Sequence, residues 1–142
     1  MPLFRRRILI ATDPLRTGTR YRAALEDDFH HFRVELVVRD GLIASLHAEA
    51  PRHPYSLCPS AADQLQQLVG TAPETSAHAV MRQVDASQQC THMLELSGLA
   101  AAAAARAVTL VAGEVVIARA AFDPLPAETR RRLLLAVAWL LR

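Results

Sequence analysis

The sequence contains no lysine and no asparagine, so all 16 of its basic residues are arginine. We attribute this bias, together with the abundance of alanine and leucine, to a GC-rich genome. The 14 carboxylates leave a net charge of only +2, which argues against a protein that binds nucleic acid through many phosphate contacts. We therefore expect no nucleic-acid partner.

Long hydrophobic runs are also missing. The least polar stretch, residues 96–105, falls short of the roughly 20 residues that a membrane-spanning helix needs. The apolar run at 8–11 stops at Asp13-Pro14 and is too short for a secretory signal. We expect a cytoplasmic protein with no membrane partner, in which two cysteines are more often reduced or metal-bound than joined in a structural disulfide.

Known nucleotide and zinc-protease motifs are absent, because the sequence has no phosphate-binding loop, no dinucleotide fingerprint and no His-Glu-x-x-His. Its length of 142 residues, 51% of them hydrophobic, suits one domain over residues 1–142 with its own core. Alternation of apolar and polar residues is clearest at 29–39, and Asp40-Gly41 is typical of a two-residue hairpin turn. Strands are expected at 7–12, 21–26, 29–39 and 42–50.

Helical patterns follow the strands. We expect helices at about 59–70, 74–84 and 90–108, then a hairpin at 109–121 and a last helix at 126–141. Strands first and helices second predict an α+β fold, an antiparallel sheet with three to four helices packed on one face. The last helix is apolar almost all round over 133–141, which indicates deep burial or a homodimer contact.

The residues best suited to chemistry are two cysteines and three histidines. Cys58 and Cys90 each stand where a helix is expected to begin, and a helix N-terminus favours a thiolate. Thiolates and imidazoles bind zinc, iron or copper. The candidate metal ligands are Cys58, Cys90, His92 and one of His30 or His31. Three of them would leave a position for an activated water, whereas all four would make the site structural or a metal carrier.

Other residues have supporting roles in this hypothesis. His31 and Asp28 are candidates for a general base or for partners of a ligand histidine, as is Asp27. Arg52 and Tyr55 are candidates for lining a pocket that takes a small aromatic or carboxylated molecule. Which of these two histidines faces the core depends on strand register, since a slip of one residue exchanges His30 and His31.

Two alternatives use the same sequence differently. One is a metal-free cysteine enzyme or sulfur-transfer module, in which His92 or His53 activates a thiol. The other is a non-catalytic module that dimerises through 133–141, with Cys58 and Cys90 as ordinary buried residues.

Several short motifs together resemble a bacterial domain-of-unknown-function family, number 2889. They are the His-bearing strand at 27–34, Cys58-Pro59, the segment 65–70, and Gln89-Cys90-Thr91-His92-Met93, in which Met93 stands where the family usually has leucine. The resemblance covers roughly residues 5–105 and implies that His30 is the recurring histidine. The predicted metal ligands are then His30, Cys58, Cys90 and His92. Residues 109–142 lie outside the part of the chain that resembles the family.

A second resemblance is to the IscU/SufE-type iron–sulfur scaffold fold. It implies that Cys58, Cys90 and His92 surround one metal site, completed by the turn at 28–31. This chain has two cysteines where the scaffold has three, which implies a mononuclear site with mixed ligands or a cluster with mixed ligands.

Overall fold

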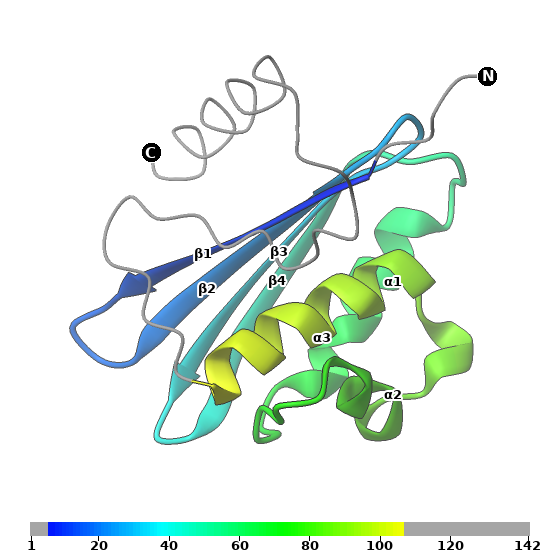
Figure 1. Ribbon diagram of the computed structural model, residues 1–142. Coiled ribbons are helices and arrows are strands. Elements are labelled where there is room, and N and C mark those ends of the chain that lie inside the picture. Colours follow the sequence, from blue (N-terminus) through cyan, green and yellow to red (C-terminus); the bar gives the residue numbers. More distant parts are fainter. Residues whose placement is uncertain (1–5, 107–142) are drawn as a thin grey trace, which may run out of the picture.

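Four consecutive strands form one antiparallel sheet in the order β1-β2-β3-β4. The computed structural model describes residues 6–106 (Figure 1). Each strand pairs with the one before it, so the sheet is a simple meander. The strands are β1 (Arg7–Pro14), β2 (Thr19–Glu26), β3 (His31–Arg39) and β4 (Leu42–Arg52).

The period of two in β3 sets which face of the sheet is buried. Phe32, Val34 and Leu36 are almost fully buried, whereas the residues between them are half-buried. Phe32 pairs with Leu25 of β2, so the two side chains lie on the same face. The hairpin between β3 and β4 is formed by Asp40 and Gly41, whose φ angles of 52° and 77° are typical of this turn.

Helices cover that buried face of the sheet (Figure 1). The longest, α3, packs against β2 and β3, and α1 packs against β4. Gly98 allows close packing within this layer, because a Cβ there would lie 2.1 Å from the carbonyl oxygen of Ala77. The helices are α1 (Cys58–Gln64), α2 (Val80–Gln83) and α3 (Thr91–Ala105), with 3-10 turns at Leu65–Leu68, Ala77–Ala79 and Ala86–Gln88.

The α+β class and the order of its elements are confirmed, but two helices differ from expectation. The helix that begins at Cys58 tightens to a 3-10 turn after Gln64, since Leu65 and Leu68 are both fully buried and a three-residue repeat puts them on one side. The segment expected to be a helix at 74–84 forms a 3-10 turn at Ala77–Ala79, followed by the four-residue helix α2.

Two expectations from the C-terminal part of the sequence lie outside the described residues. They are the hairpin at 109–121 and the helix at 126–141, which includes the predicted dimer contact. Within 6–106, no helix is long and apolar enough to cross a membrane.

Candidate functional site

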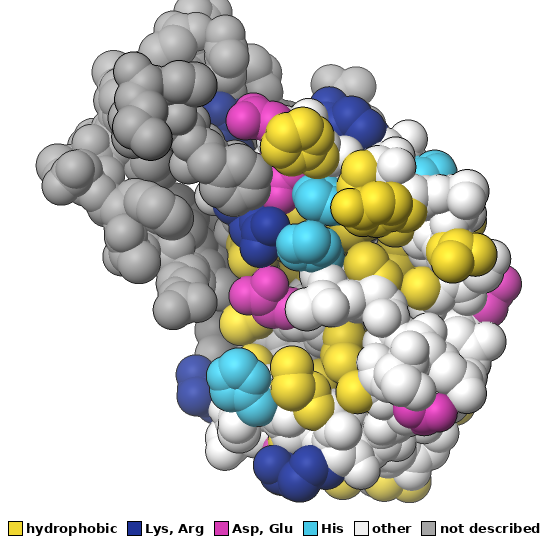
Figure 2. All heavy atoms as spheres, turned by 90° about the vertical axis from the view of Figure 1, so that its right-hand side faces the viewer, with side chains coloured by type: hydrophobic (Ala, Val, Ile, Leu, Met, Phe, Trp, Pro, Cys, Tyr) yellow, Lys and Arg dark blue, Asp and Glu magenta, His cyan; other side chains and the backbone are white. Residues whose placement is uncertain are grey.

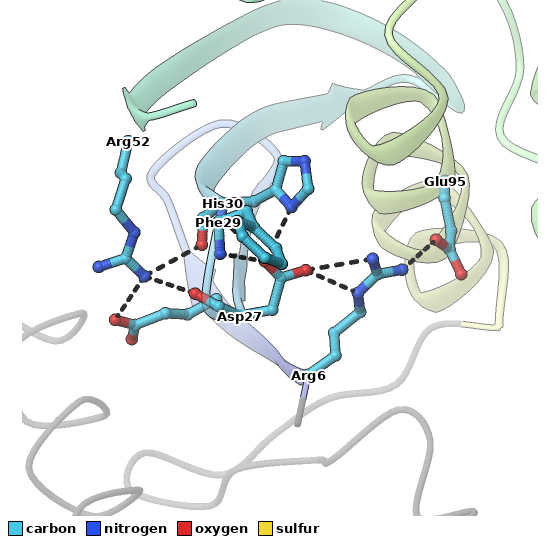
Figure 3. Close-up of polar contacts among 7 residues, drawn as sticks. Arg6, Asp27, Phe29, His30, Arg52 and Glu95 are labelled. Atoms are coloured by element: carbon cyan, nitrogen blue, oxygen red, sulfur yellow. Dashed lines mark hydrogen bonds and ion pairs between the residues drawn. The ribbon is translucent and has the colours of Figure 1, made fainter. Parts of the chain in front are cut away.

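The turn between β2 and β3 is built around the buried carboxylate of Asp27. Its Oδ1 accepts hydrogen bonds from the backbone amides of Phe29 at 2.9 Å and His30 at 2.8 Å. The same oxygen lies 2.8 Å from Nδ1 of His30, and the Asp27 amide donates to the His30 carbonyl oxygen. The turn therefore fixes the backbone and the imidazole of His30 together (Figure 3).

Two arginines complete this network. Arg6 places Nε and Nη2 each 3.1 Å from Oδ2 of Asp27, and its Nη1 lies 3.6 Å from Glu95 of α3. Arg52 donates to the carbonyl oxygens of Asp27 at 2.6 Å and His30 at 3.3 Å. Figure 3 shows the two guanidinium groups on opposite sides of the turn.

The electrostatics of Asp27 reflect these contacts. Its side chain is 0% exposed, and burial by itself raises a carboxyl pKa. The hydrogen bonds from the amides of Phe29 and His30 and from the His30 ring outweigh burial and lower the pKa of Asp27 to about 2. Asp27 is therefore a carboxylate at neutral pH, and Nδ1 of His30 carries the proton that points to it. The Nε2 of a neutral His30 is then left with a free lone pair.

A second imidazole lies against His30. The ring centroids of His30 and His92 are 4.2 Å apart, and Phe32 packs near both rings, at 5.2 Å from His30 and 6.2 Å from His92. Burial lowers the pKa of His92, and the nearby Arg6 and His30 lower it further. His92 is thus neutral at pH 7 and offers a lone pair. On the face drawn in Figure 2, histidine side chains lie next to one another, bordered by hydrophobic, basic and acidic side chains.

The two cysteines form another contacting pair. Cys58 is the first residue of α1 and Cys90 is the N-cap of α3, as the sequence predicts, and their side chains interact directly. Burial raises the pKa of the Cys90 thiol, and Cys58 adds to the rise, although the amides of Met93 and His92 oppose it. Burial thus outweighs the helix N-terminus, and the expected stabilisation of a Cys90 thiolate is wrong for the metal-free protein.

The other predicted site residues have different surroundings from the His30 and His92 pair. Asp28 is exposed, and the carboxylate beside His30 is Asp27. His31 begins β3, and the alternation of that strand turns it to the face opposite Phe32. Tyr55 is 72% exposed. Nη2 of Arg52 donates to the turn backbone and to Glu26, and the Arg52 side chain is 49% exposed.

The donors are close in pairs, but they do not surround one point. Within residues 6–106, no group of three or more His, Cys, Asp or Glu side chains is arranged to hold a metal ion. Sequence reasoning missed Arg6, which reaches the turn only through tertiary packing, and Glu95, which contacts Arg6. The spacing Asp27-x-x-His30 at a strand end is a signal that could have selected Asp27 over Asp28, because an aspartate hydrogen-bonds readily to amides two and three residues later.

The family model described as Protein of unknown function (DUF2889) matches residues 10–106. The chain belongs to this family. The match takes in β2, β3 and β4 and all three helices, so both cysteines and the His30 and His92 pair lie inside it. No curated protein and no solved structure matches the chain, so the likeness to the IscU/SufE-type fold stays a prediction.

Proposed function

We propose that this chain is a cytoplasmic metal-binding protein that takes one transition-metal ion, zinc or iron before copper, through His30, Cys58, Cys90 and His92. The observation that carries the proposal is the fixed orientation of His30. Its Nδ1 faces the buried Asp27 carboxylate at 2.8 Å, and its ring lies against His92. A histidine that binds a metal through one nitrogen usually donates its other N–H to a carboxylate or a carbonyl.

The donor chemistry supports the same reading. Two thiols and two imidazoles, the set found in tetrahedral zinc sites, come from the turn after β2 and from the starts of α1 and α3. His92 is already neutral, as a ligand must be, and a bound metal ion deprotonates a coordinating thiol outright. When bound, the ion would therefore displace the proton that burial keeps on Cys90.

Binding also requires movement of side chains, because the two pairs do not converge among residues 6–106. The backbone that carries the donors is well anchored: the amide of Leu94 donates to the Cys90 carbonyl oxygen at 2.9 Å, and that of Cys58 donates to the Tyr55 carbonyl oxygen at 3.1 Å. We therefore assign the adjustment to side-chain rotamers. The proposal covers metal binding and assigns no reaction.

The metal-free cysteine enzyme is the weaker candidate. An activated nucleophile needs a thiolate near neutral pH, whereas burial raises the pKa of Cys90. The dimerising module through 133–141 stays a prediction about residues outside the described part.

Elemental analysis of the untagged full-length chain tests the proposal. We expect about one ion per chain, retained in His47→Gln and lost in Cys58→Ser, Cys90→Ser and His30→Gln. His47 is the matched control because its side chain is 72% exposed. A wild-type protein that is folded, contains no metal and cannot be loaded with zinc or ferrous iron would contradict the proposal.

A further inference from the structure

Cys58 and Cys90 are the only cysteines of the chain, and both are free. They come from different elements, the start of α1 and the cap of α3, yet both pack on the same hydrophobic core and their side chains are close enough to interact. We propose that they form a reversible intramolecular disulfide when the protein reacts with a low-molecular-weight disulfide as the oxidant. The pair is thus a modification site.

Hydrogen bonds also join the segment before α3 to the layer that contains α1. The side-chain amide of Gln89 donates to the carbonyl oxygen of Gln64 at 3.2 Å, which ties the residue before Cys90 to the end of α1. The backbone amide of Asp85 donates to the side chain of Gln67 at 2.9 Å. These contacts hold the chain segment that leads into α3 against the end of α1 and the 3-10 turn that follows it.

Burial gives the two thiols different roles. Cys58 is 7% exposed and Cys90 is half-buried. A small disulfide therefore reaches Cys90 first. The Cys90 thiolate attacks one sulfur of the oxidant, forms a mixed disulfide and releases one small thiol. The Cys58 thiolate then attacks the Cys90 sulfur and releases the second small thiol. The two protein thiols lose two protons and two electrons, and the oxidant is reduced to two thiols.

One consequence rests on the proposed function. Cysteines joined in a disulfide no longer supply two thiolates, so oxidation removes half of the proposed ligand set. If both proposals hold, the oxidised chain binds no metal, and reduction restores binding.

The test uses the reduced, metal-free full-length chain incubated with oxidised glutathione. We expect the intact mass to fall by two hydrogens and trypsin to yield one cross-linked product that joins the peptides containing Cys58 and Cys90. Dithiothreitol should reverse both changes. Cys58→Ser, which lacks the second thiol, should stop at a glutathione adduct on Cys90, and Cys90→Ser should react far more slowly. Circular dichroism checks that each variant is folded.

The inference is overturned if the wild-type chain gives only glutathione adducts, only cross-linked dimers, or no product. The wild-type peptide map decides this even where a variant fails to fold. If the chain forms the disulfide but never binds metal, this inference is supported and the proposed function is contradicted. If the chain binds metal but forms no internal disulfide, the proposed function is supported and this inference is contradicted.

Discussion

Two short turns flank β3, and they differ in what they bury. Asp40-Gly41 at one end is a hairpin whose residues are exposed and adopt positive φ angles. The turn from Asp27 to His30 at the other end buries a carboxylate and an imidazole. Local backbone preferences are enough to explain the first turn. They do not explain the second, because reversing a chain needs no buried charge.

The buried turn carries a cost that the hairpin does not. A carboxylate removed from water has to be compensated by hydrogen bonds and opposite charge. Here the compensation comes from Arg6, from two backbone amides and from His30. Ionisable groups held in this way cluster at functional sites. The comparison therefore favours a function at the end of the sheet where Asp27 lies. Four experiments test the difference between the two turns.

Replacing aspartate by asparagine should give the largest difference in stability between the two turns. Asp27→Asn removes the charge that pairs with Arg6 and places an amide group among hydrogen-bond donors, so we expect a loss of about 3 kcal/mol in unfolding free energy. Asp40→Asn should cost less than about 0.5 kcal/mol, since asparagine tolerates a positive φ. Urea denaturation of both variants measures the difference, and equal effects would remove the distinction between the turns.

Acid should weaken only the buried turn. The pKa of Asp27 is lowered from 3.8 to about 2 by folding, so its contribution is fully present above the unfolded value. That contribution is lost as pH falls from about 4 toward 2, and it amounts to about 2 kcal/mol. The stability of the wild-type chain relative to Asp27→Asn, followed by denaturation across this pH window, should shrink by that amount. A constant difference would contradict the result.

The hairpin should respond to a change of backbone freedom rather than of charge. Gly41 has φ +77°, and a Cβ added there would meet no surrounding atom within 4 Å, so Gly41→Ala introduces backbone strain alone. We expect a loss of about 1 kcal/mol with the metal content unchanged. Thermal unfolding and elemental analysis together check this, and a loss of metal would mean that the two ends of β3 are coupled.

The smallest effect should come from the outer part of the buried network. Glu95 is 36% exposed and lies 3.6 Å from Arg6, so Glu95→Gln should cost less than about 1 kcal/mol. The loss should diminish in high salt, because the charges are partly in water. A salt-independent loss as large as that of Asp27→Asn would show that Glu95 belongs to the buried core of the site.

The sequence predicts the parts of the molecule that depend on local patterns. The alternation in β3, the hairpin at Asp40-Gly41 and the cysteines at two helix starts are all found in the structure. The match of the family model to residues 10–106 confirms the predicted family. These features follow from periodicity and turn chemistry, which short segments carry by themselves.

The details of the site depend on tertiary packing and are harder to predict. Asp27 and Asp28 are adjacent, and only the turn geometry decides that Asp27 meets His30. The pairing of His30 with His92 joins segments far apart in the sequence, and Arg6 reaches Asp27 from just before β1. The pKa of Cys90 illustrates the same limit, because helix position suggests a thiolate while burial favours the thiol.

Titration of the reduced full-length chain with cobalt(II) tests the central claim most directly. Tetrahedral coordination by thiolates and imidazoles gives intense visible bands and a thiolate-to-cobalt charge-transfer band. We predict that both saturate at about one ion per chain, that Cys90→Ser and His92→Gln lose them, and that His47→Gln keeps them. A weak, octahedral spectrum without charge transfer in the folded wild-type protein would contradict the account.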